Sequence, residues 1–318
     1  MIKIGKNIGK AVQKLKKGGL VVIPTETVYG LGANATRTES VKKIFKLKKR
    51  PKNDPLICHV NSLDKVKKYV KNVPENAQIL AEKFWPGPLT IIFEKNNLIP
   101  DITTSNLTSV AFRVPQKTIT LKVLENLSFP VAAPSANKFG YISPTSTQHV
   151  TRNFNSGIDY ILEGGNCSIG IESTIVGFEN NIPIIYRLGS TTLEALQKYI
   201  GKVKIDKILE NLPGSFKNHY SPRKKLFVGN IKKLCEKFSK NKVGILCFDK
   251  KYQYVEKENQ IILSERSSMI EACKNLYSSL YKFDNMNNVD IIISSLMPNS
   301  FLGKTINDRL IKSAEKDG

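Results

Sequence analysis

The chain has 318 residues, a formal net charge of +22 and a hydrophobic content of 41%. Such a composition excludes an intrinsically disordered protein, and the length predicts two domains. The positive charge comes mostly from Lys residues spread along both halves. It fits either an anionic partner, such as a nucleotide or nucleic acid, or a general drift of composition.

The cysteines and the N-terminus bear on the cellular location. The five Cys are odd in number and contain no C-x-x-C pair, so neither a zinc site nor a disulfide framework is expected. The basic N-terminal segment lacks the long apolar core of a signal peptide. No apolar run approaches the roughly 18 residues needed to span a bilayer. We therefore expect a cytoplasmic protein with no membrane partner.

The pattern of residues 1–205 predicts a mixed domain of helices and strands. An amphipathic helix over 6–17 ends at a Gly pair, and the apolar run at 20–23 predicts a buried strand. Further helices are expected at 39–48, 62–71, 75–84, 117–127 and 191–200, and strands at 56–60, 89–93, 109–114, 131–133, 160–162, 173–178 and 183–186. This order indicates an α/β or α+β fold.

The composition and the apolar periodicity of the chain change over residues 206–225. Pro, Gly and polar residues without periodicity predict a linker or a long functional loop there. We expect residues 226–318 to form a smaller α/β domain with a parallel sheet. Its strands are expected at 226–228, 243–248, 260–263 and 289–294, and its helices at 230–239, 267–282 and 303–315.

Four polar segments lie directly beside apolar strands, at 24–32, 48–60, 131–146 and 170–178. They place hydroxyls, charges and glycines at strand ends, where a rigid scaffold commonly presents ligand-binding groups. One such segment is ordinarily a turn. Four in one domain predict a binding site.

Several cations are candidate ligand-binding groups. Lys48 and Arg50 end a helix, where they could clamp a polyphosphate or simply satisfy the helix dipole. Arg113 and Arg187 end buried strands, and a poorly solvated guanidinium needs an acidic partner or a ligand such as a carboxylate. His59 lies inside an apolar strand, where a histidine is more often a core residue than a catalyst.

Two further features leave alternatives open. Glu26 and Glu172 lie in hydroxyl-rich turns, where each could bind Mg²⁺ or cap a helix. Residues 301–305 resemble the second half of a P-loop, but Pro298 stands where that motif needs its first glycine. We expect only a glycine at a helix start there.

Seven motifs together resemble the YrdC-like domain of threonylcarbamoyl-AMP synthases, over about residues 8–200. The linker HYSP (219–222) and GKTINDRL (303–310) resemble the long, two-domain form of that family. The seven motifs are PTETVYGLG (24–32), K-x-R-P-x-x-x-P-L with His59-Val60, FWPGPLT (84–90), AFRVP (111–115), APSAN (133–137), ESTIV (172–176) and Tyr186-Arg187-x-Gly189.

The resemblance implies a twisted mixed sheet with a basic concave cavity, plus a smaller C-terminal Rossmann-like domain. It implies a nucleotidyltransferase that joins L-threonine, bicarbonate and ATP into threonylcarbamoyl-AMP, with Mg²⁺ on the phosphates and release of pyrophosphate. A separate tRNA threonylcarbamoyl transferase would use the product to modify adenosine 37 of tRNA. The alternatives are a module that binds double-stranded RNA or tRNA without catalysis, and a P-loop ATPase in the C-terminal domain.

The resemblance also implies roles for individual residues. Lys48 and Arg50 would be catalytic, beside the phosphates. Asp54 departs from the Asn of many relatives, and an acid near polyphosphate is unfavourable unless Mg²⁺ or Arg50 offsets it. L-threonine would be surrounded by Thr27, His59, Arg113, Ala133 and Ser173, and ATP by Arg50, Asp54, Ser109, Ser135, Ser143, Arg187 and Tyr220.

Overall fold

The computed structural model describes residues 2–205 and 220–315, which fall into two compact units. The first unit contains residues 2–139, 144–168 and 172–205, and the second contains 140–143, 169–171 and 220–315. Two short N-terminal segments thus group with the C-terminal part of the chain. The sequence predicts a linker between the two domains at 206–225, and this range includes residues 206–219. Those residues, which make up most of the linker or loop expected at 206–225, lie outside the described residues.

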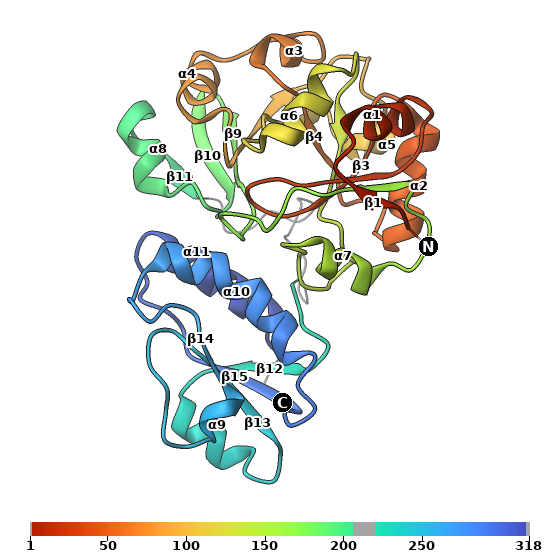
Figure 1. Cartoon of the computed structure of the whole chain (residues 1–318). Helices are drawn as coiled ribbons and strands as arrows, with labels where there is room; N and C mark the ends of the chain where they lie inside the picture. The colour runs from red at the N-terminus through yellow and green to blue at the C-terminus, as the bar shows by residue number, and fades with distance from the viewer. Residues whose placement is uncertain (1, 206–219, 316–318) are drawn as a thin grey trace. The chain divides into compact units, whose positions relative to one another are not determined.

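The first unit is built on a mixed sheet that has eleven strands within the described residues (Figure 1). Its strand order is β1-β8-β2-β3-β7-β4-β6-β5-β9-β10-β11. The strands are β1 (Ile4–Gly5), β2 (Val21–Ile23), β3 (Gly30–Asn34), β4 (Ile57–His59), β5 (Leu89–Glu94), β6 (Ser109–Arg113), β7 (Val131–Ala132), β8 (Tyr160–Leu162), β9 (Thr174–Glu179), β10 (Ile182–Arg187) and β11 (Lys204–Ile205).

The helices of this unit begin and end at local signals in the sequence. The side chain of Asn7 accepts a hydrogen bond from the Lys10 amide and caps α1, while Lys49, at φ +53°, ends α2 in the left-handed conformation. The helices are α1 (Ile8–Lys16), α2 (Thr38–Lys48), α3 (Leu63–Lys67), α4 (Glu75–Phe84), α5 (Asp101–Thr104), α6 (Thr118–Glu125), α7 (Thr147–Asn153) and α8 (Leu193–Ile200).

The central strands present one face to the hydrophobic core and the other to the polar segments. Val110 and Phe112 of β6 join the core, as do Ile91 and Phe93 of the neighbouring β5. Because side chains alternate along a strand, the intervening residues of β6 and β5 point to the opposite face. That opposite face carries the groups described below as the candidate site.

Strand β3 overlaps the polar segment 24–32, where no strand is predicted from the sequence. Its residues have low strand propensity, but pairing with β2 and β7 overrides that preference. A Cβ added to Gly32 would lie 2.9 Å from both Val131 Cγ1 and the Val21 carbonyl oxygen. The glycine is therefore required by close strand approach, which apolar periodicity does not reveal.

The second unit is a small α/β unit whose described strands are all parallel, in the order β12-β15-β13-β14. This confirms the expected parallel sheet. Buried Ile245 and Ile293 lie in its core. Its elements are β12 (Lys225–Val228), α9 (Ile231–Lys237), β13 (Val243–Cys247), the 3₁₀ helix η1 (Lys257–Asn259), β14 (Gln260–Ile262), α10 (Met269–Phe283), β15 (Ile291–Ser294) and α11 (Leu302–Ser313).

The turn before α11 does not open as a phosphate cradle. The amides of Ser300 and Gly303 donate to the carbonyls of Pro298 and Ser300, and a Cβ on Gly303 would lie 1.9 Å from the Pro298 oxygen. The glycine at the helix start is explained by this close backbone contact. In neither described range is there a helix of sufficient length and apolarity to cross a bilayer.

Candidate functional site

Arg113, the last residue of β6, joins three of the sequence motifs. Its guanidinium donates from Nε to the Gly87 carbonyl at 3.1 Å, from Nη1 to the Thr27 hydroxyl at 2.8 Å and from Nη2 to Glu26 Oε1 at 2.5 Å. The other Glu26 oxygen accepts the Gln116 amide at 2.9 Å. Glu26 is thus the acidic partner that a buried arginine requires. It does not cap a helix, since its oxygens accept from Arg113 and from the Gln116 amide, which precedes α6.

Arg187, the last residue of β10, holds Ser173 at the start of β9. Its Nε and Nη2 atoms both donate to the Ser173 carbonyl, and Nη2 also donates to the Ser173 hydroxyl at 3.0 Å. That hydroxyl lies 2.8 Å from the hydroxyl of Thr90 on β5. Gly189 permits this arrangement, because a Cβ there would lie 2.3 Å from the Ser173 carbonyl carbon.

Lys48 ties the end of α2 to the segment 133–137. The side chain is 1% exposed, and its Nζ donates to the carbonyls of Ser135 at 2.6 Å and Asn137 at 2.5 Å. Burial is the main cause of a pKa well below the ordinary lysine value, and nearby Arg50 adds to it. An ammonium has three N–H groups, so one remains beyond these two hydrogen bonds.

Arg50 and Asp54 form a buried ion pair. An Arg50 Nη2 to Asp54 Oδ1 distance of 2.6 Å joins them, and Arg50 also donates to the carbonyls of Asp54 and Pro55. Burial raises the pKa of Asp54 to about 6, even though Arg50, Lys48 and Arg187 all act to lower it. The carboxyl of Asp54 is therefore close to three cations, which places Arg187 and the end of α2 at one location.

His59, the last residue of β4, lies opposite Arg113 in the parallel pairing of β4 and β6. Burial, assisted by the positive charge of Arg113, lowers the pKa of His59 to about 3, so the imidazole is neutral at physiological pH. Its Nδ1 is buried and has no hydrogen-bond partner among residues 2–205 and 220–315. Ala133 is also buried, and its amide N–H donates to the carbonyl of Ile57, which lies on β4 together with His59.

The strand registers place the side chains of His59, Thr90 and Arg113 on one face of the sheet. Along β6, Ser109, Ala111 and Arg113 alternate with core residues and share that face. Ala111 pairs with Ile92 of β5, and Thr90 pairs with Ile175 of β9. One face therefore carries hydroxyl and guanidinium groups near Arg113 and an apolar surface toward Ser109.

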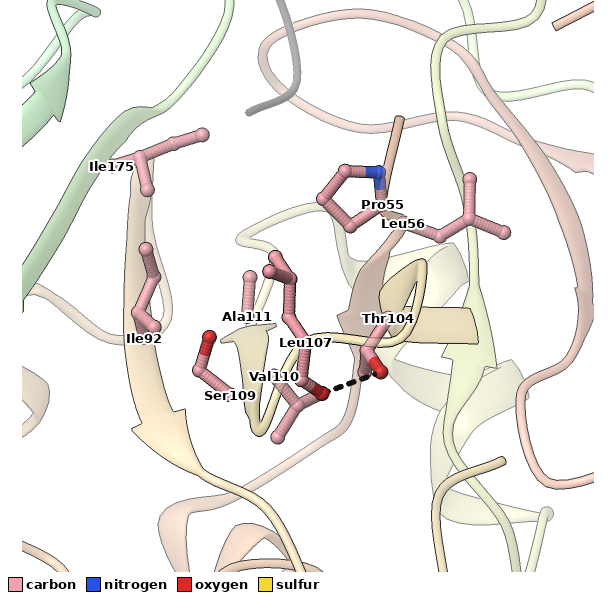
Figure 2. A pocket seen from close by; sticks show the side chains of 9 residues that line it. All are labelled: Pro55, Leu56, Ile92, Thr104, Leu107, Ser109, Val110, Ala111 and Ile175. Atoms are coloured by element: carbon pink, nitrogen blue, oxygen red, sulfur yellow. Dashed lines mark hydrogen bonds between the residues drawn. The ribbon is translucent and has the colours of Figure 1, made fainter. Parts of the chain in front are cut away.

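Figure 2 shows a small, mostly apolar pocket on that face, between Ile92 and Ile175 on one side and Pro55 on the other. Its polar groups are the side chains of Ser109 and Thr104, and Thr104 donates to the Leu107 carbonyl at 2.9 Å. Pro55 follows the Arg50–Asp54 ion pair directly in sequence, so the pocket adjoins that charged pair. Its full lining is Pro55, Leu56, Ile92, Thr104, Leu107, Ser109, Val110, Ala111 and Ile175.

The remaining two candidate residues belong to the second unit. Ser143 is fully buried there, and Tyr220 is 1% exposed. The Tyr220 ring stacks on Tyr277 with centroids 5.9 Å apart, and the Arg309 guanidinium carbon lies 4.7 Å from its centroid.

Comparison with known proteins relates this site to a family. A family model described as "Telomere recombination" matches residues 13–189, and one described as "Threonylcarbamoyl-AMP synthase, C-terminal domain" matches residues 191–315. The threonylcarbamoyl-AMP synthase of Pyrococcus abyssi is 35% identical, over 94% of this chain and 92% of that protein. The chain belongs to the threonylcarbamoyl-AMP synthase family. The resemblance seen in the sequence motifs is thereby confirmed.

Other members of the family agree over nearly the whole chain. The threonylcarbamoyl-AMP synthase of Bacillus subtilis is 34% identical over 96% of this chain and 92% of that protein. The crystal structure described as P. abyssi Sua5 complexed with L-threonine superimposes with a TM-score of 0.90 at 34% identity, covering 99% of this chain and 97% of that one. Escherichia coli YciO, at 22% identity and a TM-score of 0.52, shares the fold over 59% of this chain.

Two contacts in this family member were not anticipated from its sequence. Thr90, which contacts Ser173, lies inside an apolar strand. Its alternation with the core residues Leu89 and Ile91 was the only available signal. Glu26 was noticed as a polar turn residue, but nothing local links it to Arg113, which lies 87 positions away.

Proposed function

We propose that the chain is an L-threonylcarbamoyladenylate synthase that joins L-threonine, bicarbonate and ATP and releases pyrophosphate. One observation carries the proposal. A single sheet face carries the Arg113 group of polar contacts, and the cations Lys48, Arg50 and Arg187 gather around Asp54 beside the pocket on that face. The family relatives of Pyrococcus abyssi and Bacillus subtilis are named for this product.

L-threonine is placed at the Arg113 group. Three of the five guanidinium N–H groups of Arg113 are donated to described residues, which leaves two for the amino-acid carboxylate. Neutral His59 provides an acceptor for the substrate amine at Nδ1. Thr27, Ser173 and the small side chain of Ala133 complete the proposed set. Hydroxyls in a site without water favour threonine over valine. Valine lacks the side-chain hydroxyl of threonine, so its binding would leave buried polar groups of the protein unpaired.

ATP is placed toward Arg50 and Ser109. Arg50 and Arg187 would supply positive charge to the phosphates, and the third N–H of Lys48 would supply a hydrogen bond. Ser135 belongs to the segment that Lys48 orders. Ser143 and Tyr220, which belong to the second unit, stay predictions of the sequence resemblance. Asp54 would hold Arg50 in place, at the expense of some affinity for polyphosphate.

The chemistry then needs alignment more than covalent help. The threonine amine condenses with bicarbonate to a carbamate and water, and a carbamate oxygen attacks the α-phosphorus as pyrophosphate leaves. No group of three or more His, Cys, Asp or Glu side chains that could hold a metal occurs in residues 2–205 and 220–315. We propose that Mg²⁺ enters with the phosphates of ATP, because these side chains do not form a site of their own for it. The product would be used by a separate tRNA-modifying transferase.

Pyrophosphate release measured with each substrate omitted in turn tests this function. The expected result is release that requires both L-threonine and bicarbonate. Arg113→Lys should raise the KM for threonine at least tenfold, because Lys cannot reproduce the forked contacts. Arg187→Lys should raise the KM for both ATP and threonine, because Arg187 is proposed to face the phosphates and also holds Ser173 of the threonine set. Release from ATP alone at the full rate would overturn the proposal.

A further inference from the structure

Thr90 of β5 lies between two members of the group proposed for L-threonine, because β5 is flanked by β6 and β9 in the sheet. Its hydroxyl is 2.8 Å from that of Ser173, which directly precedes β9. On the other side, the register of β5 and β6 joins Ile91 to Phe112. The same register continued by one residue brings Thr90 opposite Arg113. Thr90 is therefore next to both residues, although the sequence resemblance assigns it no role.

The hydrogen bonds of Thr90 and Ser173 leave one hydroxyl proton unused. The contact between the two hydroxyls consumes one of their two protons, and either oxygen can be its donor. Arg187 Nη2 donates to the Ser173 oxygen at 3.0 Å, which occupies a lone pair but no proton. No residue in 2–205 or 220–315 accepts the second proton, and both side chains are buried. The pair can therefore donate one hydrogen bond to a bound ligand.

The position of the two residues favours Ser173 as the one that keeps the unused proton. When Thr90 donates to Ser173, both lone pairs of the Ser173 oxygen are occupied, one by Thr90 and one by Arg187. The Ser173 hydroxyl can then only donate. The opposite direction would leave the free donor on Thr90, inside a strand, whereas Ser173 lies at a strand end, where ligand-binding groups are commonly presented.

We propose that Thr90 is a positioning residue through which the site selects L-threonine by its side-chain hydroxyl. Thr90 donates to Ser173, and Ser173 donates its own proton to the side-chain oxygen of the substrate. Arg113 is placed at the substrate carboxylate, so the side-chain oxygen is the acceptor left for Ser173. Valine has no such oxygen, and its binding would leave the buried Ser173 proton unpaired. The inference rests on the proposed function, which places L-threonine beside Arg113 and Ser173.

The test measures pyrophosphate release by Thr90→Val and Thr90→Ser at varied threonine and varied ATP, with L-valine as a competitive inhibitor. Thr90→Val keeps the shape and removes the hydroxyl, so the KM for threonine should rise about two- to tenfold, as for loss of one hydrogen bond. The KM for ATP and the inhibition constant of valine should stay within twofold, because neither depends on the Ser173 proton. Thr90→Ser keeps the hydroxyl and should restore the KM for threonine. The matched control is Thr103→Val, at another fully buried threonine, whose hydroxyl donates to the Ala35 carbonyl at 2.8 Å. It should leave the KM for threonine unchanged.

The outcomes separate this inference from the proposed function. If the wild-type chain makes no threonine- and bicarbonate-dependent pyrophosphate, the proposed function fails. If the wild-type chain is active but Thr90→Val keeps its KM for threonine, or loses affinity for threonine and valine equally, the positioning role is wrong. Should Thr90→Val fail to fold, as judged by its thermal transition, Thr90→Ala provides the same comparison with Thr90→Ser.

Discussion

Asp54 offers the most informative single substitution, because its buried carboxyl lies among the cations proposed to bind phosphate. Its pKa of about 6 in the folded chain compares with an ordinary value of 3.8. The folded state therefore keeps a proton that the unfolded state releases. Ionised Asp54 lowers the stability as pH rises through this window, and the full destabilisation is present above pH 6.

The magnitude follows from the two pKa values. The destabilisation is about 2 kcal/mol at pH 5 and about 3 kcal/mol at pH 8, so it grows by about 1 kcal/mol between them. Asp54→Asn keeps the shape of the side chain and removes the titration. Relative to the wild-type chain, the variant should therefore gain about 1 kcal/mol in unfolding free energy on going from pH 5 to pH 8.

Urea unfolding of the wild type and Asp54→Asn at pH 5 and pH 8 measures this difference. The same substitution removes an anion beside the proposed phosphate site, so the KM for ATP at pH 8 should fall about two- to fivefold. A stability difference between the two proteins that does not change with pH would refute the account of Asp54. So would a KM for ATP that rises in the variant, since the carboxylate would then assist binding.

Three further substitutions have definite expected outcomes. Lys48→Met removes two hydrogen bonds to backbone carbonyls, so the unfolding free energy measured by thermal melting should fall by about 1–3 kcal/mol. The kcat/KM for ATP should fall at least tenfold. Unaltered kinetics would argue against the proposed role of Lys48 at the phosphates. Gly189→Ala would place a Cβ 2.2 Å from the Thr174 amide nitrogen. It should destabilise the chain by about 2 kcal/mol or more in urea unfolding and impair binding of both substrates. Lys304→Ala should leave pyrophosphate release unchanged, whereas inactivation would revive the P-loop alternative.

The sequence predicted most of the fold because apolar patterns reveal elements that bury one face. Helix 75–84 and strand 160–162 were predicted with the bounds that α4 and β8 have. The two-residue strands β1 and β11 were not predicted, since they exist only through pairing with β8 and β10. Strand β3 was missed because its residues are small. Close packing against the neighbouring strands requires them, and they do not form the pattern of large apolar side chains that predicts a strand.

The site was predicted as a set of motifs but not as a set of contacts. Strand ends showed where Arg113 and Arg187 would lie, because a cation after an apolar run is conspicuous. The partners of these arginines, Glu26 and Ser173, depend on strand register, which local sequence does not determine. The same holds for residues 140–143, which group with the second unit, where the Ile142 carbonyl accepts a hydrogen bond from distant Tyr281.

The central claim is that one sheet face holds an amino acid and ATP together for condensation. The most direct measurement is incubation with ATP, ¹⁴C-bicarbonate and each amino acid in turn, followed by rapid separation of labelled nucleotide. The account predicts a labelled adenylate with L-threonine, little or none with valine, and none in the absence of ATP. Equal labelling with every amino acid, or no labelled adenylate while ATP is still split to AMP and pyrophosphate, would contradict it.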